Sequence, residues 1–260
     1  MITLSQRKAQ LNWRPSRPNP HRLQYYSVTT TQTKILPITA WFPAWDQGQE
    51  GSCTAHGNGA LAKQVLYIKH PTLKDFMPSR QFLYYNERVI EGDPQEDNGA
   101  QVGDGMTAIE KWGICDEKLW PYSKPFAKKP SASAYKAALL HQGLEAATVP
   151  ATVDAIKAAI SAQHPVSGGF TVYSSFMTDV VASSGIMPLP TKKEQIEGGH
   201  CVAWDGFDDN FKAHGEHGFF YCRNSWGTNW GLKAFPGWFM MPYSAIKKLC
   251  SDFHVLVNIE

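Results

Sequence analysis

Four residues of this sequence have the side chains needed for acyl transfer through a thiol. Cys53 stands where a helix is expected to begin, and the amides and dipole of a helix N-terminus favour the nucleophilic thiolate. The imidazole of His200 could accept the thiol proton and later protonate a leaving amine. The amide of Asn224 could hold that imidazole in one tautomer. Gln47 and the backbone N–H of Cys53 could supply the two donors of an oxyanion hole.

Taken singly, these residues have simpler interpretations. A lone cysteine is usually a small apolar core residue, which is how we interpret Cys115 and Cys250. A histidine beside glycines and an Asn-Ser-Trp-Gly segment both occur in ordinary strands and turns. The presence of all three in one chain, in this order, favours a catalytic site.

Two other groupings have metal-like spacing. Cys53 and His56 share one face of the expected helix, and His214 and His217 flank a Gly-Glu pair. A zinc site requires three or four convergent ligands, and neither pair has a further ligand close in sequence. We therefore expect no metal and no cofactor, and we interpret His56 as a residue packed beneath the nucleophile's helix.

The elements that must position these residues change type along the chain. Apolar periodicity and capping residues predict helices over 53–70, 78–91, 105–112, 132–141 and 153–163. Alternation and turn residues predict strands over 165–173, 200–204, 218–224, 237–241 and 253–257. Helices followed by strands indicate an α+β fold, with a helical N-terminal lobe, an antiparallel β-rich C-terminal lobe and a cleft between them.

Residues 1–35 differ from the rest of the chain, because prolines and arginines recur there with few apolar residues. We expect an N-terminal arm over 1–35 and one two-lobed domain over 36–260. The arm is either a strap on the surface or a short prosegment, and a prosegment that crosses the cleft would make the protein a zymogen.

Composition excludes several classes of protein. The 260 residues carry a formal net charge of +2, with 18% charged and 12% aromatic residues, which excludes a disordered chain. The near-neutral charge gives no basic footprint for nucleic acid. No apolar run suits a membrane span or a secretory signal. We therefore expect no nucleic-acid or membrane partner. We also expect a monomer.

Three short motifs carry a resemblance to a known family: Gly51-Ser52-Cys53, Gly199-His200 and Asn224-Ser225-Trp226-Gly227. With Gln47 six residues before Cys53, they resemble the motifs of papain-family cysteine peptidases, and the resemblance runs from about Leu36 to the C-terminus. It implies the papain-like two-lobe fold. It also implies catalytic Cys53, His200 and Asn224, an oxyanion hole of Gln47 and Cys53, and a Trp226 that shields the His–Asn hydrogen bond from water.

Two departures separate the chain from the lysosomal and plant members of that family. Glu50 stands where those members have a disulfide-bonded cysteine, and Thr54 stands where they have tryptophan. This form of the nucleophile motif, with the arm that contains Trp13, is more similar to bacterial and large-virus members. The resemblance to these members implies a cytoplasmic or virion-associated location rather than a lysosomal one.

Strand alternation bears on the five cysteines. If His200 and Asn224 face the cleft from paired strands, Cys201 and Cys222 point to opposite faces and are not placed to form a disulfide. We expect all five thiols to be free and only Cys53 to be strongly acidic.

The resemblance further implies a pocket for the second residue before the scissile bond, drawn from Met106, Gly169, Gly199 and Cys201. These residues are small or apolar and would favour a hydrophobic side chain, although Met106 could equally be a core residue.

The function implied is a cysteine endopeptidase that hydrolyses peptide or protein substrates through a thioester. Two alternatives stay open. Deamidation, transglutamination and peptide ligation use the same thioester and differ in the acceptor. A non-catalytic binding or structural module would keep the fold without the chemistry.

Overall fold

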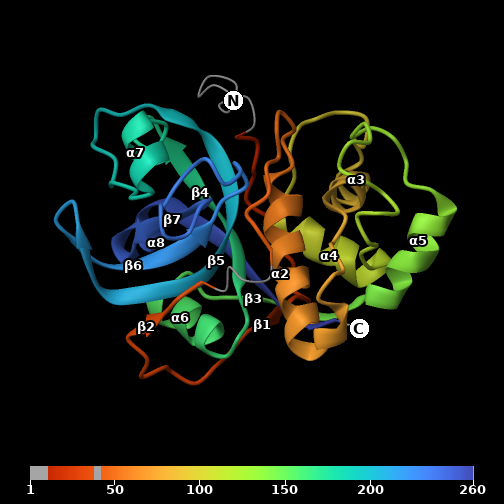
Figure 1. The fold of residues 1–260 in the computed structure, drawn as a ribbon, viewed down its shortest axis with the longest axis horizontal. Coiled ribbons are helices and arrows are strands. Elements are labelled where there is room, and N and C mark those ends of the chain that lie inside the picture. The colour runs from red at the N-terminus through yellow and green to blue at the C-terminus, as the bar shows by residue number, and fades with distance from the viewer. Residues whose placement is uncertain (1–10, 38–41, 260) are drawn as a thin grey trace.

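The computed structural model describes residues 11–37 and 42–259, which form two lobes side by side (Figure 1). The expected arm lies within the described residues from Leu11 onwards, and its first ten residues lie outside them. The N-terminal lobe consists of helices: α2 (Cys53–Lys69), α3 (Arg80–Glu91), α4 (Val102–Trp112) and α5 (Ala132–Ala138), with the 3-10 turns η2 (Pro71–Leu73) and η3 (Leu139–His141).

An eight-stranded sheet forms the basis of the second lobe. Its strands are β1 (Leu23–Gln24), β2 (Lys34–Ile35), β3 (Gly143–Thr148), β4 (Val166–Tyr173), β5 (Ile196–Ala213), β6 (Glu216–Arg223), β7 (Trp238–Pro242) and β8 (Cys250–Ile259). They lie in the order β1-β3-β8-β4-β5-β6-β7, and β2 pairs with β5. The β1–β3 pair is parallel and the others are antiparallel. The helices α6 (Val153–Ser161), α7 (Asp179–Ser184) and α8 (Tyr243–Leu249) pack against this lobe.

Local capping explains why the predicted helices form where they do. The hydroxyl of Ser79 accepts a hydrogen bond from the Phe82 N–H at the start of α3, and Thr152 caps α6 in the same way. Gly92 ends α3 in a left-handed conformation, with φ of 90°, that a glycine adopts without strain. These helices and the α+β class are therefore confirmed.

Some elements differ from the prediction. β5 extends over 18 residues. Its polar second half pairs with β6 in a long two-stranded ribbon. The apolar run 200–204, on which the prediction rested, covers only part of this strand. Helix α4 begins at Val102, earlier than expected. The strands β1, β2 and β3 and the helices α7 and α8 were not predicted. Short strands gain their stability from pairing partners far away in sequence, so local alternation does not reveal them.

The two largest of the four apolar clusters among the described residues lie on either side of the boundary between the lobes. One lies between the sheet and the helices of the second lobe, and the other surrounds α2 in the first lobe. Helix α2 lies at the boundary itself, where it packs on β5 and β4 (Figure 1). In the part of the chain that the structure describes, no helix has the length and apolarity to cross a bilayer.

Candidate active site

Cys53 is the first residue of α2, and a close helix–sheet contact places it beside β5. One turn later, a Cβ on Gly57 would lie 2.9 Å from the Ser167 hydroxyl and 3.0 Å from the Cys201 sulfur, so only glycine permits this approach. The backbone N–H of Cys201, the residue after His200, consequently faces the Cys53 sulfur. β5 thus places His200 beside the N-terminus of α2.

The N-cap residue Ser52 leaves that helix end uncapped by its own side chain. Its hydroxyl instead hydrogen-bonds the Tyr122 hydroxyl at 2.6 Å, and Tyr122 donates to the carbonyl of Gln47 at 2.8 Å. The first amides of a helix have no intrahelical acceptor. The first backbone N–H groups of α2 therefore point out of its N-terminus, where they would stabilise a developing negative charge.

His200 and Asn224 form a direct pair. The Nε2 atom of His200 lies 2.8 Å from Oδ1 of Asn224, which follows β6 immediately. Because an amide oxygen accepts, Nε2 carries the proton, and exchange with the thiol falls to Nδ1 on the other side of the ring. The Trp226 ring stacks on the imidazole with centroids 4.9 Å apart and covers the pair, which is fully buried. The structure therefore brings these three predicted residues together.

Gln47 lies in the loop before α2, and its side-chain amide is fixed at both ends. Its Oε1 accepts a hydrogen bond from the Ser225 hydroxyl, and its Nε2 donates to the carbonyl of Glu50 at 2.8 Å. These two partners determine which end of the amide is nitrogen. Nε2 carries a second hydrogen that can serve an oxyanion. Ser225 was not among the predicted site residues, although it stands next to Asn224 in the motif.

The first described part of the N-terminal arm, which begins at Leu11, runs between the two lobes (Figure 1). The N–H of Gly199 donates to Leu11, and the N–H of Trp13 donates back to Gly199, both at 3.1 Å. On the opposite wall, the N–H of Arg14 donates to Ala100 at 3.3 Å. The segment thus forms a parallel bridge with β5 one residue from His200. Cys53 and His200, the residue next to this bridge, are both 0% exposed.

The indole of Trp13 fills the pocket expected for a substrate side chain. A Cβ on Gly169 would lie 1.8 Å from the indole, so this glycine makes the space that the ring occupies. Gly199 lies under the Trp13 backbone, and Met106 and Cys201 belong to the same apolar cluster as Trp13. Two of the four predicted pocket residues, Gly169 and Gly199, therefore lie against Trp13, whereas Met106 and Cys201 are known only to share its apolar cluster. The sequence analysis did not identify Trp13 as the occupant, and a lone tryptophan in a polar arm is the signal that could have revealed it.

Polar contacts tie the rest of the arm to acidic residues. Arg14 pairs with Glu91, and Arg22 forms a two-pronged ion pair with Glu110, with both N–O distances 2.7 Å. Ser16 donates to Asp252 through both its N–H and its hydroxyl. The basic character of the arm is thus matched by carboxylates on the domain.

The expected acidity of Cys53 is wrong for this form of the protein. Burial raises the pKa of Cys53 to about 12, and the nearby Glu87 also disfavours the thiolate. Helix N-terminal stabilisation is present, but desolvation by burial outweighs it. Glu87 lies buried under α2, where burial raises its pKa well above the usual range and Thr54 donates to it at 2.7 Å.

Cys115 is buried as expected, whereas Cys250 is only half-buried against the core. All five cysteines are free, and Cys201 and Cys222 lie in different apolar clusters. His56 packs edge-on against Trp45 and Tyr122, and burial lowers its pKa. Among the described residues, no three His, Cys, Asp or Glu side chains are grouped closely enough to hold a metal ion.

Comparisons with known proteins match nearly the whole chain. The family model described as papain family cysteine protease matches residues 37–251. An uncharacterized peptidase C1-like protein of Acanthamoeba polyphaga mimivirus is 38% identical over 237 residues, which are 87% of this chain and 73% of that protein.

Solved structures are similar as well. Xylellain, a cysteine protease from Xylella fastidiosa, has a TM-score of 0.87 and 34% identity, with 97% of each chain covered. The bromelain protease from Ananas comosus has a TM-score of 0.65 and 17% identity, with 88% of this chain and 100% of that chain covered, and shares the fold.

Proposed function

Since the chain belongs to the papain family of cysteine proteases, we propose that it is an endopeptidase in which Cys53 is the nucleophile and His200 the acid–base residue. Its two-lobed, papain-like α+β fold agrees with that family. The observation that carries the assignment is the 2.8 Å pair of His200 and Asn224, covered by Trp226, beside the N-terminus of α2. Asn224 orients the imidazole, and Gln47 and the Cys53 N–H bind the oxyanion.

Acylation follows from these positions. The Cys53 thiol transfers its proton to Nδ1 of His200, and the sulfur forms a bond to the peptide carbonyl carbon. The carbonyl oxygen becomes an oxyanion that accepts hydrogen bonds from Nε2 of Gln47 and the N–H of Cys53. When the C–N bond breaks, His200 donates its proton to the leaving amine. The acyl group remains on the sulfur as a thioester.

Deacylation uses the same groups, with water as the nucleophile. His200 removes a proton from a water molecule as the water oxygen attacks the thioester carbon. The same two donors stabilise the second oxyanion. The C–S bond then breaks, the product acid leaves, and the proton on His200 returns to Cys53. An amine in place of water would give transfer instead of hydrolysis.

We further propose that residues 1–35 are a prosegment that keeps the enzyme latent. The arm backbone takes the hydrogen-bonding positions of Gly199 and Ala100, and Trp13 takes the pocket. A peptide substrate would compete for these positions. The high pKa of the covered Cys53 is in keeping with a latent state.

A peptidyl epoxide and a peptide library test the assignment together. We expect the epoxide to label Cys53 but not Cys250, and a His200→Ala variant to lose both labelling and cleavage. His217→Ala, at an exposed histidine, is the matched control and should retain both. Mass spectrometry of the products, with and without a primary amine, separates hydrolysis from acyl transfer. No labelling of Cys53 between pH 5 and 8, with Trp13→Ala used to loosen the arm, would favour a non-catalytic module.

A further inference from the structure

A small cavity lies between α2 and β5 and reaches the segment that follows β6. His56 of α2 and Asn224 both line it, and each residue is only 3% exposed. The space suits about one water molecule. A buried cavity binds an ordered water when polar groups face it, and an apolar cavity stays dry. The atoms that His56 and Asn224 present to the cavity therefore decide what it binds.

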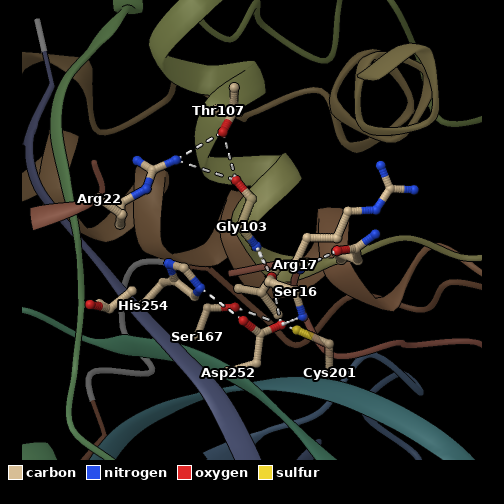
Figure 2. Close-up of polar contacts among 12 residues, drawn as sticks. Ser16, Arg17, Arg22, Gly103, Thr107, Ser167, Cys201, Asp252 and His254 are labelled. Carbon is tan, nitrogen blue, oxygen red and sulfur yellow. Dashed lines mark hydrogen bonds and ion pairs between the residues drawn. The ribbon is translucent and has the colours of Figure 1, made fainter. Parts of the chain in front are cut away.

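Packed secondary structure forms the walls of this cavity. Gly57 and Cys201 line it from α2 and β5, and a Cβ on Gly57 would lie 3.0 Å from the Cys201 sulfur. That sulfur lies 3.4 Å from the hydroxyl of Ser167 on the neighbouring strand β4 (Figure 2). The helix and the sheet are thus in close contact on this side, and the cavity is part of the packed interior.

Asn224 presents a hydrogen-bond donor to the cavity. Its Oδ1 accepts from Nε2 of His200 and from the Ser225 N–H, both at 2.8 Å. These two donors identify the other end of the amide as nitrogen. Because Oδ1 is turned to His200, which does not line the cavity, Nδ2 is the end that faces it. Within the described part of the chain, the buried Nδ2 has no hydrogen-bond partner.

His56 presents an acceptor. Its Nδ1 lies 2.9 Å from the carbonyl oxygen of Ser52, and because a carbonyl only accepts, Nδ1 carries the proton. Burial lowers the pKa of His56 well below its usual value, and the charges of Arg80 and His200 act in the same direction. The ring is therefore neutral, with a lone pair on Nε2. This atom is also buried, without a partner among the residues that the structure describes.

A buried donor and a buried acceptor on the wall of one cavity are complementary. Each is costly to leave unpaired, and a water molecule that accepts from Asn224 and donates to His56 satisfies both. We propose that the cavity binds one water molecule, which links Nδ2 of Asn224 to Nε2 of His56 and makes His56 a positioning residue for the catalytic pair. The catalytic part of this inference rests on the proposed function.

The water acts on catalysis through the amide of Asn224. With the amide nitrogen held in the cavity, Oδ1 stays turned to His200 and keeps the proton on Nε2 of that ring. Nδ1 of His200 then remains the atom that exchanges a proton with Cys53. Without an acceptor across the cavity, the amide nitrogen gains by rotating toward another partner, and the imidazole is less firmly held in one tautomer.

Two substitutions separate the roles of the two ring nitrogens of His56. A glutamine amide extends about as far as Nε2, whereas an asparagine amide extends only as far as Nδ1. In the full chain carrying Trp13→Ala, we expect His56→Asn to lower kcat for one peptide about fivefold, with KM unchanged. His56→Gln should recover most of that loss. Equal losses in the two variants would overturn the positioning role.

A double-mutant cycle supplies the control for a merely structural effect. If His56 acts through Asn224, His56→Asn should add little to the loss caused by Asn224→Ala. Unfolding curves for each variant show whether it is folded under the assay conditions. A loss of kcat that adds fully to that of Asn224→Ala would contradict the proposal.

The last test needs no catalysis. In the isotope-labelled full chain, we expect NMR of the histidine rings to show His56 neutral, with its proton on Nδ1, between pH 5 and 8. Nuclear Overhauser contacts should connect a slowly exchanging water molecule to the side-chain amide of Asn224. A proton on Nε2 of His56, or an Asn224 amide without a water contact, would overturn the water site. If no variant cleaves any peptide, the proposed function fails, while these spectra still decide the water site.

Discussion

The hydroxyl of Ser225 donates a hydrogen bond to Oε1 of Gln47 and thereby joins the loop before α2 to the segment that follows β6. The backbone N–H of Gln47 also donates to the Ser225 carbonyl, at 2.8 Å. The two residues are far apart in sequence and come from different lobes. Their contact fixes the amide beside Cys53 relative to the His200–Asn224 pair.

Removal of the Gln47 amide should therefore lower the rate of chemistry rather than substrate binding. We expect Gln47→Ala to reduce kcat by about 10²–10³-fold, because one oxyanion donor is lost. Ser225→Ala should have a smaller effect in the same direction, since the amide remains but loses one anchor. Steady-state kinetics on one peptide checks both. A change confined to KM would be inconsistent with an oxyanion role.

Loss of Asn224 should leave the imidazole without its orienting acceptor. We expect Asn224→Ala to reduce kcat by about 10²-fold, within the range found for general acid–base groups. A Trp226→Phe variant should have a weaker effect, because a ring still covers the pair. Unfolding curves for each variant serve as the control. Equal activity of Asn224→Ala and the wild type would exclude this role.

Trp13 should control access to the nucleophile. We expect Trp13→Ala to increase the alkylation rate of Cys53, because the pocket anchor is lost and the thiol regains water, which lowers its pKa from about 12. Val28→Ala, at a position of the same arm that is 88% exposed, is the matched control. Identical rates for the two variants would mean that Trp13 does not hold the arm in place.

Gly169 offers a way to displace the arm without changing it. A methyl group there would lie 1.8 Å from the Trp13 indole. We expect Gly169→Ala to increase Cys53 alkylation in the wild-type arm and to add little when Trp13 is already alanine. Such non-additivity is the signature of two residues in contact. Additive effects would indicate that Gly169→Ala acts elsewhere.

Glu50 should make stability fall as pH rises. Burial raises the pKa of Glu50 to about 7 from its usual 4.5, so the folded protein binds this proton more tightly than the unfolded chain does. Its contribution to stability is complete below pH 4.5 and is lost as pH rises to 7. We expect Glu50→Gln to gain stability relative to the wild type over that range, as measured by urea midpoints. Because Asp205 titrates in the same window, the difference between the two proteins is the informative quantity. A difference that does not vary with pH would contradict this.

The chemistry of the site was accessible from the sequence because it depends on residue type and on short motifs. Cys53, His200, Asn224 and Gln47 were each identified beside residues that mark a helix start, a strand or a turn. Ser79 and Thr152 likewise marked helix starts through hydrogen bonds that span three residues. Such interactions are local, and local sequence therefore predicts them.

The tertiary structure decided whether the site is open or covered. Trp13 reaches the pocket only because Gly169 and Gly199, more than 150 residues away, leave space for it. The expected acidity of Cys53 is reversed by its burial in the assembled fold. Burial and solvation depend on which segments meet in space. The sequence by itself therefore determined which groups could react, and the assembled fold determined that they are covered and which side chain covers them.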